Sequence, residues 1–154
     1  MSWSVRRRHA SESRERGAAA VEFALVIIPL MVLVWGIICY GVMFSYRQAL
    51  SQAAGEGARA AVAAPTASIS SAATTAISNA LGSYHQTCGT TLVCSVSSPT
   101  SGTLPNGATC PSGHTCVQVT VTFPYRSNPL IPNVPGLGVI VPTNLTFTQT
   151  VEVS

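Results

Sequence analysis

Apolar and polar residues are unevenly distributed along the chain, with a long apolar run near the start and a polar second half. The run from Phe23 to Phe44 holds 22 residues and no charge. As a helix it measures roughly 33 Å, close to the thickness of a bilayer's hydrocarbon core. Tyr40, Phe44 and Tyr46 fit an aromatic belt at the membrane surface. The run therefore predicts a transmembrane helix.

The helical pattern continues beyond the apolar run to residue 64, and Pro65 ends it. A secretory signal has a shorter apolar core of about 7–15 residues, so we expect a retained span and not a removed signal. Small residues recur at three- and four-residue spacing after the run and allow close helix packing. The alternative is that alanine is simply the best helix former. The predicted packing positions are Pro29, Gly36, Ala53, Gly57 and Ala61.

The rest of the chain predicts one short helix and a small sheet. Apolar residues at helical spacing indicate a second helix within 65–83, with a Ser or Thr at 66–68 as its cap. Thr91–Ser97 and Val117–Tyr125 are strand candidates, and a last strand from Leu145 is expected to pair with the second of them. Prolines make 127–142 an irregular connection. The predicted fold class is α+β.

Charge indicates how the chain lies across a membrane. Five arginines and two glutamates precede residue 17, whereas the chain from Ala18 onward is neutral. This asymmetry places the N-terminus in the cytoplasm and the C-terminal domain outside. The exported part has no basic face, so a nucleic-acid partner is not expected. The expected domains are a basic cytoplasmic leader (1–17), a transmembrane and extended helix (18–64, membrane span about 23–44), a second helix (65–83) and an extracytoplasmic β-rich domain (84–154).

Four cysteines lie in the polar second half, and an even number beyond a membrane helix predicts two disulfides. Three connectivities are open. A metal site with His85 or His114 is the alternative, but the spacing differs from that of zinc ribbons. Cys39 is expected to be a packing residue within the span. The disulfide candidates are Cys88, Cys94, Cys110 and Cys116.

The sequence contains no recognisable catalytic constellation. It has no aspartate, and its exported part has only Glu56 and Glu152 as acids. Neither lies beside a histidine in a catalytic motif, and no nucleophile has a visible base. We therefore expect a protein that is not an enzyme and needs no cofactor or small-molecule substrate.

Glu22 is the most informative residue because it stands at the edge of the apolar run. A carboxylate in lipid costs a few kcal/mol unless it is paired or lies at the interface, so it usually marks a function. If the chain were cut after Gly17, Ala18 would carry a free amino group four residues from Glu22 on the same helix face. In a bundle, Glu22 could instead meet the amino end of a neighbouring subunit. The alternative is that Glu22 only extends to the membrane surface.

Gly17 with Glu22 five residues later resembles the processing site of type IV prepilins. The longer pattern, Gly17-Ala-Ala-Ala-Val-Glu-Phe-Ala-Leu-Val-Ile-Ile-Pro-Leu followed by Glu56-Gly-Ala-Arg59, resembles the TadE-like family. Those proteins are pseudopilins or minor pilins of the tight-adherence (Flp-type) pilus. The resemblance covers about a third of the chain and implies little about residues 84–154.

The resemblance implies cleavage by a prepilin peptidase between Gly17 and Ala18 and an assembly role for Glu22. The implied partners are the lipid bilayer, that peptidase, other pilins or pseudopilins and the pilus assembly machinery. The expected location is the plasma membrane, as a single-pass protein that can enter a surface pilus. Two rival functions are an uncleaved membrane-anchored adhesion module and a domain released by signal peptidase.

Overall fold

The computed structural model describes residues 5–130 and 142–153. Residues 1–4 of the expected leader and 131–141 of the expected irregular connection lie outside the described residues. The chain forms two compact units that meet in the sequence between Val42 and Met43. One helix, α1 (Val5–Ala63), contributes to both units, and Pro29 lies inside it.

The first unit is built from the N-terminal part of α1. Most of its large apolar side chains from Val21 to Val42 are exposed, with exposed fractions of 43–69%. The helix from Gly17 to Ala63 includes a stretch that is long and apolar enough to cross a membrane, and none of that stretch is buried within the chain. A core helix of a soluble domain would bury this surface, because exposed apolar area is unfavourable in water.

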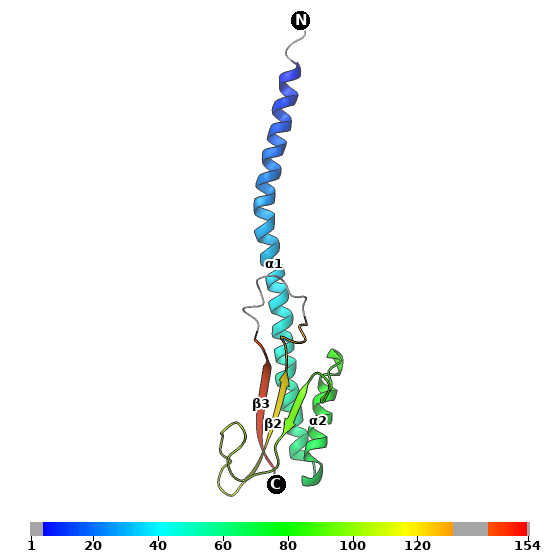
Figure 1. Ribbon diagram of the computed structural model, residues 1–154, viewed down its shortest axis with the longest axis vertical. Helices are drawn as coiled ribbons and strands as arrows, with labels where there is room; N and C mark the ends of the chain where they lie inside the picture. The colour runs from blue at the N-terminus through cyan, green and yellow to red at the C-terminus, as the bar shows by residue number, and fades with distance from the viewer. Residues whose placement is uncertain (1–4, 131–141, 154) are drawn as a thin grey trace. The chain divides into compact units, whose positions relative to one another are not determined.

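The second unit joins the C-terminal part of α1 to a short helical segment and a sheet (Figure 1). The helical segment comprises η1 (Thr66–Ser68), α2 (Ile69–Ala80) and η2 (Gly82–Tyr84). The strands are β1 (Val93–Val96), β2 (Thr115–Phe123) and β3 (Leu145–Val153), and they form an antiparallel sheet in the order β1-β2-β3. The predicted α+β fold is confirmed.

The predicted pairing of the last two long strands is also confirmed. β2 and β3 align residue for residue, from Thr115 opposite Val153 to Phe123 opposite Leu145. β2 begins two residues before the predicted start and ends at Phe123, not at Tyr125. Pro124 explains this end, because proline has no N–H to donate to a neighbouring strand.

The alternation along β2 separates an apolar face from a hydroxyl-rich face. Val117, Val119, Val121 and Phe123 are buried. On the other face, Thr120 lies within hydrogen-bond distance of Thr148 (3.2 Å between hydroxyl oxygens), and two more threonines pair in the same way. The period of two thus directs one face of the sheet toward the helices.

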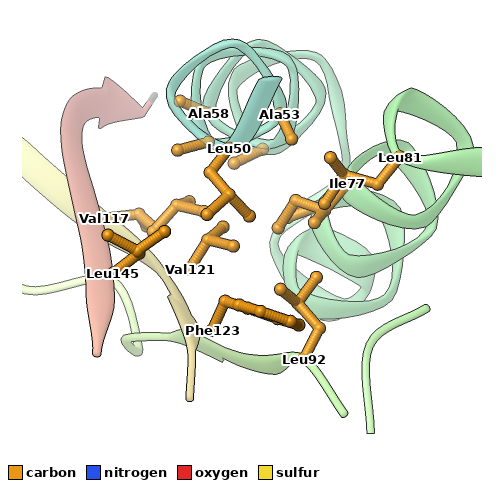
Figure 2. Packing of buried hydrophobic residues seen from close by; sticks show 14 of the residues in the cluster. Leu50, Ala53, Ala58, Ile77, Leu81, Leu92, Val117, Val121, Phe123 and Leu145 are labelled. Atoms are coloured by element: carbon orange, nitrogen blue, oxygen red, sulfur yellow. The ribbon is translucent and has the colours of Figure 1, made fainter. Parts of the chain in front are cut away.

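The apolar face of the sheet packs against both helices (Figure 2). α1 contributes Leu50 and a row of small residues, and α2 contributes Ile77. Because alanine and glycine have little or no side chain, the backbone of α1 can lie close to its neighbours. The buried small residues of α1 are Ala53, Ala54, Gly57, Ala58 and Ala61.

The start of α2 differs from the expectation of a capping side chain. Ser68 occupies the N-cap position, but its side chain makes no capping hydrogen bond. Its hydroxyl instead donates to the carbonyl oxygen of Pro65 at 3.1 Å. The preceding 3₁₀ turn brings that carbonyl within reach, so a local bond replaces the cap.

Candidate functional site

Gly17 and Ala18 lie in α1 without any break in the helix. Both are exposed, and a Cβ added to Gly17 would meet no heavy atom within 4 Å. Neither close packing nor a left-handed backbone therefore requires glycine at this position. Within a helix glycine is less favourable than alanine by about 1 kcal/mol. The fold of the described residues therefore gives no reason for a glycine at position 17.

Glu22 lies one helical turn beyond Ala18, on the same face of α1. The glutamate is exposed and stands between the exposed apolar residues Val21 (61%) and Phe23 (67%). Among the residues whose side chains are described, it forms no salt bridge. A charged group at the centre of a bilayer costs about 3 kcal/mol even on insertion scales, so a carboxylate beside an apolar surface gains from a positive partner.

The predicted packing positions fall into two groups. Pro29 is exposed and Gly36 half-buried in the first unit, and a Cβ added to Gly36 would meet nothing within 4 Å. In the second unit, Ala53, Gly57 and Ala61 are buried against other parts of the same chain. A Cβ at Gly57 would lie 2.7 Å from Cγ1 of Ile77. These three positions are therefore occupied by packing within the chain.

The four cysteines of the polar half form two local disulfides. Cys88 pairs with Cys94 and Cys110 with Cys116, with Cα atoms 5.5 and 5.8 Å apart. Each bridge closes a short loop, which stabilises the fold by about 2 kcal/mol in the chain-entropy account. Cys39 is a free thiol. These bridges use the cysteines that the alternative metal site would need, and the described residues hold no cluster of three or more metal-ligating side chains.

The two histidines of the second unit have different surroundings. His85 is exposed at the end of η2 with a positive φ of 55°. His114 contacts the carboxylate of Glu152 through Nδ1 on the surface. The pairing of β2 with β3 explains this contact, because it sets Glu152 opposite Cys116, two residues after His114. Sequence analysis missed the contact, since 38 residues separate the two partners.

An open polar groove lies between α1 and the end of α2, and no pattern in the sequence indicates it. Its lining includes Gln48, Gln52 and Glu56 of α1 with Ser83 and Tyr84 of η2. Glu56 pairs with Arg59 at 3.0 Å on the same helix. The lining also includes Ser45, and it contains no histidine or cysteine.

An aromatic cluster closes the apolar core next to this groove. The ring of Tyr46 packs edge-on against Tyr84 and Phe123, with centroids 5.2 and 4.9 Å apart. Tyr46 is fully buried. Its burial, with a smaller contribution from Tyr84, raises the pKa of Tyr46 to about 12. Its hydroxyl is therefore neutral at physiological pH, and the cluster acts as an apolar contact between α1 and the sheet.

These features define a class of protein: one exposed apolar helix that could span a membrane, continuous with a small disulfide-linked α+β unit. Residues 17–59 match the family model described as TadE-like protein, which confirms the resemblance carried by Gly17, Glu22 and the Glu-Gly-Ala-Arg segment. No curated protein and no solved structure matches the chain significantly.

The match begins at Gly17 and covers the apolar stretch and the part of α1 that packs on the sheet. It does not extend to α2 or to the strands. The TadE-like family is a structural, pilus-related family. Together, the match and the apolar helix indicate a membrane protein associated with the Tad pilus.

Proposed function

We propose that the chain is a TadE-like pseudopilin or minor pilin that takes part in assembling a tight-adherence pilus or a related secretion apparatus. The observation that carries this proposal is the family match that starts at Gly17, with Glu22 five residues later at the edge of an exposed apolar helix. A prepilin peptidase cuts after Gly17 and releases the leader 1–17. The new amino group of Ala18 then becomes available to a carboxylate.

The proposed topology follows from the charges before the apolar run. The leader stays in the cytoplasm, the membrane span covers about 23–44, and the chain beyond it lies outside as a single-pass protein. In the proposed division, the helix of 18–64 carries a second helix (65–83) and a β-rich domain (84–154). Two disulfides agree with an oxidising compartment for the exported part.

Glu22 is proposed to pair with the N-terminal amino group of a neighbouring pilin or pseudopilin. Such a pair removes the cost of a lone carboxylate beside lipid and sets the axial register of adjacent helices. The partners are thus the peptidase, other pilins or pseudopilins and the assembly machinery of the pilus.

Deleting the gene is expected to abolish or strongly reduce surface pili, because a subunit needed for assembly is lost. The measurement is a count of pili per cell by electron microscopy, with the intact gene supplied in trans as the control. Unchanged pili in the deletion strain would contradict the proposed role. Cells that keep their pili but lose surface attachment would favour the uncleaved adhesion module instead.

A further inference from the structure

We propose that one end of the second unit binds anionic phospholipid headgroups through Arg47 and Arg126. We call this surface the arginine end; its exposed residues are Phe44, Arg47, Tyr84, Arg126 and Leu130. The inference rests on the proposed function only in requiring that the apolar stretch of α1 lies in a membrane.

The first argument is the charge left over after the visible ion pairs are formed. In the second unit, Glu56 pairs with Arg59 and Glu152 contacts His114. Those two glutamates are the only acidic residues from Met43 to Ser154. Arg47 and Arg126 are exposed, and no described carboxylate is their partner. Each of these two arginines therefore presents a positive charge without a carboxylate partner among the described residues.

The second argument is that the core brings the two arginines to the same end of the unit. Arg47 follows Tyr46, whose ring lies 4.9 Å from that of Phe123. The ring of Phe123 in turn lies 6.3 Å from that of Tyr125, the residue before Arg126. Figure 1 shows the end of β2 and the start of β3 together beside α1.

Two further contacts fix this end of the unit. The N–H of Arg126 donates to the carbonyl oxygen of Thr143 at 3.1 Å, just before β3 begins. The hydroxyl of Tyr84 lies 3.3 Å from that of Ser45, which brings η2 to the same part of α1. Phe44, Tyr84 and Leu130 remain 51%, 37% and 37% exposed. The arginine end thus combines cationic, aromatic and apolar side chains.

The third argument is covalent continuity with the apolar stretch. Arg47 follows Phe44 by three residues in one helix, a rise of about 4.5 Å. Each headgroup layer of a bilayer is roughly 5–7 Å thick, so Arg47 reaches headgroup depth when Phe44 lies at the edge of the hydrocarbon. Arginine binds phosphate through its planar set of donors, and aromatic residues favour this interface.

The positive charge of the two arginines and the position of Arg47 at headgroup depth together favour an anionic lipid as the ligand. A basic residue near an anionic membrane surface gains about a fivefold factor in binding, so two arginines gain about 25-fold. The arginine end would then hold the second unit against the outer face of the plasma membrane before pilus assembly. The proposed function assigns no binding surface to the second unit, and this inference adds a lipid-binding surface to it.

The test uses the full chain in lipid nanodiscs made of phosphatidylcholine alone or of an equal mixture with phosphatidylglycerol. Hydrogen–deuterium exchange is measured for the segment 124–130, where the N–H groups of Arg126 and Asn128 are hydrogen-bonded. We expect exchange to be slower in the anionic discs by about 25-fold. Arg47→Gln or Arg126→Gln should reduce the slowing to about fivefold, and the double variant should abolish it.

Arg59→Gln is the matched control, because it removes an exposed arginine that already has Glu56 as its partner. It should retain the slowing. Equal exchange rates in both kinds of disc would overturn the inference. So would a loss of slowing in the Arg59→Gln variant as large as in the Arg47→Gln or Arg126→Gln variant. Either result would leave the membrane span intact. A chain that does not co-elute with the discs would overturn the span as well. If the slowing of exchange depends on protein concentration and not on lipid composition, the surface binds a second copy of the chain and the inference is wrong.

Discussion

Replacing Gly57 with valine is expected to lower the free energy of unfolding of the second unit by about 3 kcal/mol. Gly57 is buried where α1 meets both α2 and β2. A Cβ there would lie 2.7 Å from Cγ1 and 2.9 Å from Cδ1 of Ile77, and 3.3 Å from Cγ1 of Val119. Ile77 and Val119 are themselves fully buried, so neither can move aside without disturbing its own packing. Figure 2 shows Ile77 among the core side chains between α1, α2 and the sheet.

Gly55→Ala provides the matched control on the same helix. A Cβ at Gly55 would meet nothing within 4 Å, so this substitution should stabilise α1 by up to about 1 kcal/mol. The measurement is thermal unfolding of the full chain in detergent with its disulfides intact. The melting temperature should fall by about 10–20 °C for Gly57→Val and rise by a few degrees for Gly55→Ala. Equal small shifts in both variants would contradict the packing described for Gly57.

Replacing Glu22 with alanine is expected to reduce pili per cell by about tenfold or more while leaving the protein in the membrane. The apolar stretch that drives insertion is unchanged, and removal of a carboxylate makes insertion easier. What is lost is the carboxylate proposed to pair with the amino end of a neighbouring subunit. An uncompensated charge beside lipid costs a few kcal/mol, and each 1.4 kcal/mol is a tenfold factor in an equilibrium.

Two further variants separate charge from other effects of the Glu22 substitution. Glu22→Gln keeps the size and hydrogen-bonding oxygen but loses the charge, so it should behave like Glu22→Ala. Glu56→Ala removes a carboxylate that pairs only with Arg59 on the surface, and a surface pair is worth less than about 1 kcal/mol, so piliation should be normal. Pili are counted in cells whose membrane fractions contain equal amounts of each variant. Normal pili with Glu22→Ala would remove the role proposed for this residue.

The parts of the fold that follow a local period were predictable from sequence. The 22-residue apolar run and the alternating valines of β2 each repeat a pattern set by the geometry of one element. The bounds were less predictable where a single residue decides them. β2 ends at Phe123 because of Pro124, and α2 begins without a capping side chain because Ser68 bonds to Pro65.

The parts that depend on contacts across the chain were not predictable. Loop geometry determines which of the three disulfide connectivities forms, and spacing alone does not specify it. The small residues of α1 indicated close packing but not the partner, which is the sheet and α2 of the same chain. His114 and Glu152 meet only because β2 and β3 pair in one register.

For the candidate site, the sequence is more informative than the structure. Gly17 and Glu22 were identified from their spacing in the sequence, whereas the described residues show no packing contact for a Cβ at Gly17 and no salt bridge for Glu22. The partners proposed for these two residues are other molecules, so the isolated chain does not contain them. The exposure of Glu22 beside Phe23 and the absence of a packing reason for Gly17 are the traces that remain.

The most direct test of the pseudopilin proposal is N-terminal sequencing of the protein purified from native membranes. The proposal predicts a mature chain that begins at Ala18, with the leader removed after Gly17. A chain that begins at Met1 or Ser2 would contradict the proposed processing and indicate an uncleaved anchor. A start within or after the apolar stretch would indicate release by signal peptidase.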